Sequence, residues 1–510
     1  MNGSVRERRW VLVAIGAVYL YAFPFFAALR HANELPRILT TEQLAERGTF
    51  HLDERVTDLG SIADISTTPD GHRYQNKAPG PSILGLALYY PLSVAYRWTG
   101  HRPPLMLVTW LLRVALATIP TIVLLAFFGR VAARFADSDE ARSGALAAYA
   151  LGSMALPLGL LFMSHAIAAA LVGVAFAVSV TAVRERTLHE LRAAAIVGAL
   201  VGLAMLCEYQ ALFAAFFVVG YLLWGAERRI RAGVAVAAAS LPSLAALALY
   251  HWSAFGSPFR TGYAYSVDPD NRLGFMGIVG FSEKSLSQLF TNVDNGLLLL
   301  SPWVVLAVVG AVSIARRADA RARVGREALV ATLVAAVYCA FVAALVPQFG
   351  RAGWSVGPRY LAVAMPFVAW LAAAGLDVCV RHAALRVLAF ALIWIGVGIN
   401  VLAATTYPHW PIDFRNPLFE VSLRLLRDGY APHSLGTLVG LRGPASLVPL
   451  YVGVIALVFA LLAPARRYVL EAVLALAVAA FAVSLYERIA VTPLHTAAGI
   501  WQFVTSTYEP

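Results

Sequence analysis

The sequence has 510 residues, of which 60% are hydrophobic and 14% are charged, whereas soluble proteins carry roughly 25% charged residues. This composition excludes a soluble globular enzyme, a disordered chain and a secreted disulfide scaffold, and it indicates a helical protein embedded in a lipid bilayer. The net charge of +11 is carried almost entirely by arginines in short clusters between apolar runs. That arrangement is typical of the cytoplasmic loops of membrane proteins, and we expect no nucleic acid partner.

The apolar runs predict an all-α membrane protein of one domain, 1–510, with about thirteen transmembrane helices. A fourteenth run, 81–98, is short and contains Gly85 and Pro91. If this run lies along the outer interface instead of crossing, every short arginine cluster falls on the cytoplasmic side. The N-terminus is then cytoplasmic and the tail 487–510 lies outside. The predicted spans are 10–29, 104–128, 143–160, 162–183, 192–207, 209–224, 233–255, 296–315, 328–346, 359–379, 387–404, 446–463 and 468–486.

The first outer segment, 30–103, carries the most unusual chemistry. Glu34 follows the first span directly, and a carboxylate at that depth is costly unless it is paired or used. Lys77, one of only two lysines, stands in Asn76-Lys77-Ala78-Pro79-Gly80 just before the interfacial run. Glu34 would serve as a general base and Lys77 would bind a phosphate. A simpler interpretation stays open, in which the acids solvate a loop and the lysine stem lies along the membrane surface.

Asn33-Glu34, the stretch 44–50, Tyr74 and Lys77-Ala78-Pro79-Gly80 together resemble the first outer loop of GT-C glycosyltransferases. The resemblance is strongest to the bacterial branch related to protein mannosyltransferases and the lipid A aminoarabinose transferase. It implies an outward-facing active site and a polyprenyl-phosphate-linked sugar as donor. It also implies that Glu34 lies at the catalytic carboxylate position and Lys77 at the donor-phosphate position. That branch has an Asp-Glu pair where this chain has Asn33-Glu34, so Asp53 and Asp58 stay open as alternative bases.

Further polar residues fall on the outer side of the predicted spans. Arg359 opens one span, and an arginine fork suits a phosphate well. Arg113 lies in the outer part of another span and would pair with Glu208 or face the phosphate. No close spacing of histidines and acids marks a metal site, and a divalent metal between a carboxylate and the donor phosphate stays open. The remaining candidates, for which a satisfied interfacial histidine or an aromatic belt is the competing interpretation, are His165, Tyr209 and Tyr407.

These features predict a membrane glycosyltransferase of the bacterial inner membrane that transfers a sugar from a polyprenyl phosphate to a glycan, lipid or protein acceptor at the periplasmic face. Lys77, Arg359 and His409 would stabilise the departing phosphate, and the later outer segments, 256–295 and 405–445, would shape the acceptor site. A secondary transporter or lipid flippase is the alternative, but it would place polar groups near the bilayer midplane. An O-antigen ligase or polymerase is a further alternative, which would use late-loop arginines such as Arg415, Arg424 and Arg427.

Overall fold

The computed structural model describes residues 3–22, 26, 28–29, 31–55, 58, 64–346, 353–464, 467–488, 492 and 494–508. Parts of the predicted outer segments 30–103 and 487–510 lie outside these residues, as do residues 347–352. Within them the chain is almost wholly helical, with one two-stranded sheet.

Eight helices of the described chain are long and apolar enough to cross a membrane. They are α5–α6 (Leu105–Arg113 and Ile119–Phe135), α9 (Ser164–Val180), α10 (Glu190–Cys207), α12 (Arg229–Phe255), α16 (Ala318–Ala344), α19 (Ala383–Thr405), α22 (Val448–Leu462) and α23 (Val469–Tyr486). Shorter apolar helices complete the bundle: α1 (Gly3–Tyr21), α11 (Ala211–Gly225), α15 (Val305–Arg316) and α18 (Met365–Cys379).

Several predicted spans are not continuous helices: α1 ends at Tyr21 inside 10–29, a break at Ser301 divides 296–315, and α18 starts only at Met365 inside 359–379. Span 143–160 is also divided. It consists of α7 (Asp139–Ala150), a turn, and the short helix α8 (Ala155–Gly159). The turn exposes the carbonyl of Gly152, which accepts hydrogen bonds from Ser301 Oγ at 3.0 Å and from Trp303 Nε1 at 2.7 Å. Broken backbone is tolerated inside a membrane protein when neighbouring side chains satisfy its polar groups in this way.

The remaining elements belong to the loops. They are α2 (Leu35–Arg47), β1 (Ile65–Thr67), β2 (Arg73–Gln75), α4 (Gly80–Arg97), α13 (Glu283–Thr291), α14 (Leu297–Leu300), α20 (Arg424–Arg427), α21 (Leu435–Leu438) and α24 (Leu494–Thr505). Helix α4, which corresponds to the predicted interfacial run, packs along α2 and is not among the eight candidate spans. Its position relative to the bilayer stays a prediction.

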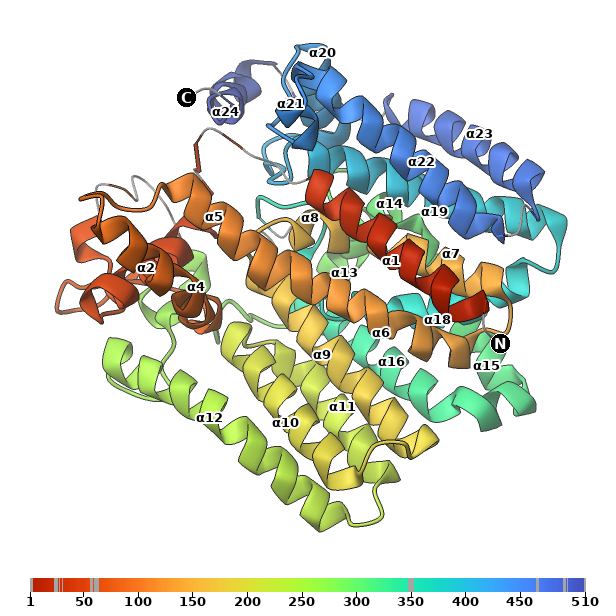
Figure 1. Ribbon diagram of the computed structural model, residues 1–510, viewed down its shortest axis with the longest axis horizontal. Coiled ribbons are helices and arrows are strands. Elements are labelled where there is room, and N and C mark those ends of the chain that lie inside the picture. The colour runs from red at the N-terminus through yellow and green to blue at the C-terminus, as the bar shows by residue number, and fades with distance from the viewer. Residues whose placement is uncertain are drawn as a thin grey trace.

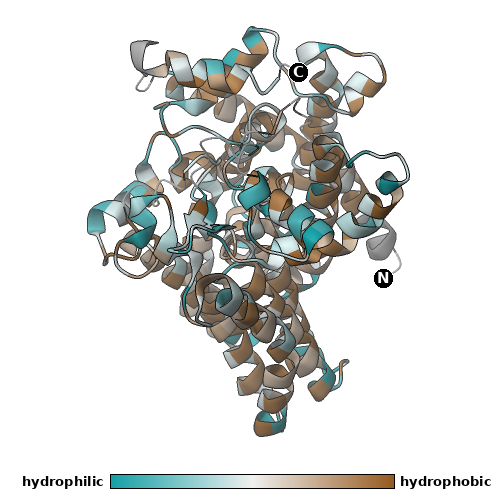
Figure 2. Cartoon of the chain, turned by 90° about the vertical axis from the view of Figure 1, so that its left-hand side faces the viewer, coloured by the Kyte–Doolittle hydropathy of each residue, from teal (hydrophilic) through white to brown (hydrophobic). Residues whose placement is uncertain are grey.

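The long helices lie side by side, and most of the loop elements gather at one end of the bundle. In Figure 1, α2 and α4 are on the left, α24 is at the upper left, and α20 and α21 are at the top. The N-terminus, the far end of α6 and the α15–α16 turn lie at the opposite end, on the right. Figure 2 looks onto the left-hand end, where hydrophilic residues cluster in front of apolar helices. We call this the loop end.

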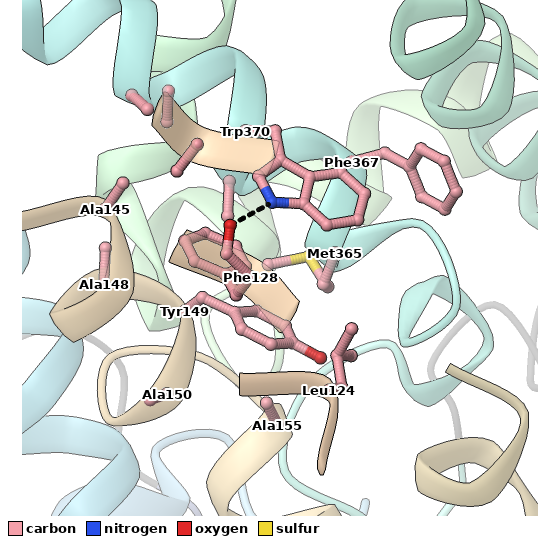
Figure 3. Packing of buried hydrophobic residues seen from close by; sticks show 14 of the residues in the cluster. Leu124, Phe128, Ala145, Ala148, Tyr149, Ala150, Ala155, Met365, Phe367 and Trp370 are labelled. Atoms are coloured by element: carbon pink, nitrogen blue, oxygen red, sulfur yellow. Dashed lines mark hydrogen bonds between the residues drawn. The ribbon is translucent and has the colours of Figure 1, made fainter. Parts of the chain in front are cut away.

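Aromatic packing joins the helices at the centre of the bundle (Figure 3). The Trp370 indole of α18 donates a hydrogen bond to the carbonyl of Phe128 in α6 at 3.3 Å. The Phe128 ring stacks on Tyr149 of α7, with ring centroids 5.5 Å apart. Because lipid tails are as apolar as these side chains, such packing and hydrogen bonding hold membrane helices together more than the hydrophobic effect does.

Candidate functional site

Glu34 lies at the start of α2 and is completely buried. Arg113, the last residue of α5, donates from Nε and Nη2 to its two carboxylate oxygens at 2.8 and 2.7 Å. The backbone amide of Phe162 donates to the same carboxylate at 2.7 Å, and His409 Nε2 lies 3.3 Å from it. Burial disfavours the charged form, but Arg113 and His409 outweigh it, so the pKa of Glu34 lies well below its usual value. Arg113 therefore pairs with Glu34 and not with Glu208, which was one of the two possibilities left open by the sequence.

Two histidines cover this ion pair. The rings of His31 and His409 stack with centroids 3.8 Å apart and planes 20° apart. His31 Nε2 also lies 3.1 Å from the carbonyl of Trp354. The side chains of His31, Glu34 and His409 can each bind a metal ion, and their ligand atoms lie within 4.8 Å of one another. They do not fit a divalent ion as arranged, because Arg113 already neutralises Glu34 and donates hydrogen bonds to both of its carboxylate oxygens.

A second network of polar side chains begins at Arg37, one helical turn further along α2. Arg37 is 2% exposed, and it donates to the carbonyl of Asn33 at 2.8 Å and to Ser164 Oγ at 3.1 Å. Asn33 Nδ2 in turn donates to Asp64 Oδ2 at 3.0 Å. Pro36 near the start of α2 and Gly48 at its end, with φ of +69°, fix where this helix begins and stops. The helix therefore presents Asn33, Glu34 and Arg37 to different partners at one end of the bundle.

Lys77 belongs to the same network of polar side chains. Its Nζ lies 3.2 Å from Asp64 Oδ1 and 3.3 Å from the hydroxyl of Tyr263, whose ring centroid is 4.8 Å away. Burial disfavours the lysine charge, but Asp64 more than compensates, so the pKa of Lys77 is raised. Burial likewise opposes ionisation of Asp64, yet Lys77, with Arg359 and Arg37, lowers its pKa. Both groups are charged at neutral pH.

Glu208 lies just beyond the end of α10 and faces the same group. Its carboxylate accepts a hydrogen bond from Ser164 Oγ and lies 3.2 Å from His165 Nδ1. Burial raises its pKa, against the smaller opposing effects of Ser164, Arg37, Lys77 and Arg359. No arginine or lysine forms an ion pair with Glu208 in the described part of the chain.

Gly80 explains how the Lys77 motif approaches Glu208. A Cβ on Gly80 would lie 2.6 Å from the carbonyl oxygen of Leu206 and 2.7 Å from the backbone of Cys207. Only glycine lets the start of α4 pack this closely against the end of α10. The motif thus needs glycine for its position beside α10.

Arg359 lies at the entry to α18 and is 8% exposed. Its Nε has no hydrogen-bond partner among the described residues, although its charge contributes to the pKa shifts of Asp64, Lys77 and Glu208. Arg359 therefore lies near enough to Asp64, Lys77 and Glu208 to act on their charges. A phosphate clamp shared by Lys77 and Arg359 stays a prediction. We call Arg37, Asp64, Lys77, Glu208 and Arg359 the loop-end cluster.

The other predicted candidates have separate surroundings. His165 contacts Glu208, and its ring meets that of Tyr360 edge-on. The Tyr209 hydroxyl lies 2.9 Å from His251 Nε2. Tyr407 packs against Phe26 and His409. Asp53 contacts His51 and His72, and the exposed Asp58 pairs with Arg55. Among the described residues, neither Asp53 nor Asp58 forms an ion pair or hydrogen bond with Lys77.

Comparison with solved structures places this arrangement in a known fold. The crystal structure of ArnT from Cupriavidus metallidurans in the apo state matches with a TM-score of 0.50 and 15% identity, over 94% of this chain and 76% of that chain. The chain shares its fold with ArnT. A crystal structure of the same protein bound to undecaprenyl phosphate gives a TM-score of 0.44 at 14% identity, over 93% and 78% of the two chains. No family model and no curated protein matches the sequence. The predicted fold class, a polytopic all-helical membrane protein, is confirmed.

Sequence reasoning missed three members of the site. Arg37 lies four positions after Asn33 on a helix, a spacing at which side chains contact one another, so that pairing was readable in principle. Asp64 was one acid among several in a polar segment, and nothing local distinguishes it. Tyr263 reaches Lys77 across 186 positions, a proximity that only the fold supplies.

Proposed function

We propose that this protein is a membrane glycosyltransferase of the GT-C type that uses a polyprenyl-phosphate-linked sugar as donor. The acceptor hydroxyl, on a glycan, lipid or protein, would be glycosylated at the periplasmic face of the bacterial inner membrane. The observation that carries this proposal is the excess of buried positive charge in the loop-end cluster. Arg37, Lys77 and Arg359 face two carboxylates, and burial favours the neutral form of one of them, Glu208.

A phosphate is the group that such a cluster would accept. A buried cation without a partner is costly, and Arg359 keeps an unpartnered Nε. Arginine forms two parallel hydrogen bonds to a phosphate, and lysine adds a compact charge. The cluster lies where loops meet the apolar helices, so a lipid phosphate would reach it with its chain still among the helices. The departing polyprenyl phosphate would be stabilised where its negative charge develops.

The proton of the acceptor would pass to Glu208. The acceptor oxygen forms a bond to the anomeric carbon of the sugar, and the bond from that carbon to the phosphate oxygen breaks. The polyprenyl phosphate leaves with the bonding electrons. A general base works best when its pKa is near the working pH. Burial raises the pKa of Glu208 and so brings it closer to neutral pH. Asp64 would hold Lys77 in place.

Glu34 was the first choice of base from the sequence, and its surroundings favour a different role. Both of its oxygens accept hydrogen bonds from Arg113 and its pKa is lowered, which makes it a weak base closed off from an acceptor. We assign Glu34 to the structural support of α2. His409, which contacts Glu34, would act with it there and not at the phosphate.

Binding of a probe lipid tests the phosphate clamp. Purified full-length protein in detergent should bind undecaprenyl phosphate and should bind undecaprenol, which lacks the phosphate, far more weakly. Each charge-assisted hydrogen bond is worth about 1.5–3 kcal/mol, so Lys77→Ala or Arg359→Ala should weaken binding by roughly 10- to 100-fold. The control is Lys284→Ala, which removes the only other lysine, an exposed residue of α13. This variant should bind the lipid like the unaltered protein.

Equal binding of the alcohol and the phosphate, or unaltered binding by the Lys77→Ala variant, would refute the clamp. Incubation with polyprenyl-phosphate sugars then separates transfer from transport. A glycosyltransferase consumes the donor and releases free polyprenyl phosphate, whereas a flippase returns the donor intact.

A further inference from the structure

A group of three side chains at the loop end takes no part in the chemistry proposed above. His51 and Asp53 follow α2, and His72 immediately precedes β2. Their ligand atoms, one from each residue, all lie within 4.8 Å of one another. We propose that His51, Asp53 and His72 form a binding site for Zn²⁺ or a similar first-row divalent cation, which fastens the segment after α2 to the β1–β2 hairpin.

The donor atoms of both histidines already lie close to one carboxylate oxygen. His51 Nδ1 lies 3.1 Å and His72 Nδ1 lies 2.6 Å from the same oxygen, Asp53 Oδ2. Around a tetrahedral zinc ion with bonds near 2.0–2.1 Å, neighbouring ligand atoms are roughly 3.3 Å apart. The spacing of His51 from Asp53 already suits a pair of zinc ligands, and that of His72 from Asp53 would widen by less than about 1 Å. The two rings stack with centroids 5.1 Å apart, so they would also turn to aim both nitrogens at the ion.

The surroundings suit a cation. His51 Nδ1 is a buried atom without a hydrogen-bond partner in the described chain, so the ion would satisfy it. The backbone amide of Arg73 donates to Asp53 Oδ1 at 2.8 Å, and such hydrogen bonds orient a ligating carboxylate. His72 is exposed, which leaves a path for the ion and room for water as the fourth ligand.

The donor set selects the class of metal. Two imidazoles and one carboxylate suit zinc and its neighbours, whereas Mg²⁺ and Ca²⁺ prefer oxygen ligands throughout. This site also differs from the trio of His31, Glu34 and His409, where Arg113 already neutralises the carboxylate.

The site has a structural consequence for the loop end. The amide of Leu52 donates to the carbonyl of Arg73 at 2.7 Å, so the two segments already touch. Strand β2 then runs directly into Asn76 and Lys77. An ion at this position would fix the strand from which Lys77 projects, without itself contacting the loop-end cluster.

Metal analysis of the full-length protein tests the proposal. Protein without a histidine tag is stripped with EDTA, dialysed against Zn²⁺ and analysed by mass spectrometry for metals. We expect one zinc per chain, and Mg²⁺ in excess should not displace it. Loss of ligands should weaken zinc binding at least about 100-fold, because removal of supporting groups alone costs 10- to 100-fold. The His51→Ala/His72→Ala variant should therefore retain none after dialysis.

The matched control is His101→Ala, which removes an exposed histidine of the same outer segment and should keep the zinc. A second variant guards against misfolding: Asp53→Cys should still bind, and with Co²⁺ it should show a thiolate-to-metal charge-transfer band. Zinc should also raise the melting temperature of the unaltered protein and leave that of the double variant unchanged. Absence of zinc from the unaltered protein, or zinc that persists in the double variant and is lost with His31→Ala, would overturn the proposal.

Discussion

Glu34 and Arg113 form an ion pair in which the side chains are 0% and 1% exposed. Removing one partner of such a pair leaves a buried charge uncompensated, which costs about 3–5 kcal/mol. We therefore expect Glu34→Gln to lower the free energy of unfolding by that amount, measured as a fall in melting temperature of the purified protein. This expectation replaces the sequence-based one, in which Glu34 serves as a general base.

The double variant Glu34→Gln/Arg113→Gln should recover part of that loss, since neither charge is then left alone. Glu54→Gln is the control, because Glu54 is half exposed and its loss should matter little. Since the pKa of Glu34 is lowered in the folded protein, its stabilisation is complete above the unfolded pKa of about 4.3 and disappears only as the pH falls through the lowered value. An unchanged melting temperature at neutral pH would contradict the structural role.

The pH dependence of transfer should report Glu208. A general base must be ionised, so activity should fall as the pH drops through its pKa, which burial raises. We expect the acid limb of the rate profile to lie above the ordinary glutamate value of about 4.3. Glu208→Gln should remove this limb and lower the rate by at least about 100-fold. If Asp64→Asn instead removes the limb and Glu208→Gln keeps it, the base is Asp64.

Elements pack closely where glycines face each other. In the α15–α18 contact, a Cβ on Gly310 would lie 2.0 Å from the carbonyl oxygen of Leu371, and one on Gly375 would lie 2.0 Å from that of Leu306. We expect Gly375→Ala to lower stability by at least about 1–3 kcal/mol through overpacking, seen as aggregation or a lower melting temperature. Gly398→Ala meets no atom within 4 Å and should be neutral or stabilise α19, because alanine favours a helix over glycine by roughly 0.5–1 kcal/mol.

Element prediction succeeded where hydrophobicity alone decides. Spans such as 233–255 and 387–404 correspond to α12 and α19, since about 20 apolar residues have few stable alternatives in a bilayer. The break between α7 and α8 was not predicted, because it depends on Ser301 and Trp303 reaching Gly152 from 149 and 151 positions away. The candidate site likewise contains some residues that the sequence singles out and some contacts that only the fold reveals. Lys77 stood out as one of two lysines and Glu208 as a lone acid between two spans. The pairing of Arg113 with Glu34, 79 positions apart, depends on the fold.

The orientation of the whole molecule is a prediction from its arginines. The N-terminus and the far end of α6 lie together, opposite α2 and α4 (Figure 1). We expect the arginine-rich end to be cytoplasmic. A reporter that works only in the cytoplasm should then give a signal when fused after Arg134, and a reporter that works only in the periplasm should give a signal when fused after Pro510. A periplasmic signal at Arg134 would reverse the topology and place the loop-end cluster in the cytoplasm.

The contact between His31 and Trp354 can form only late in the synthesis of the protein. Trp354 follows His31 by 323 positions, and a ribosome adds about 5–20 residues per second, so the first outer segment waits on the order of 15–65 s for this partner. Glu34 meets Arg113 and Phe162 early, but His409 arrives later still. During synthesis the start of α2 therefore stays only partly covered until Trp354 and His409 have been made.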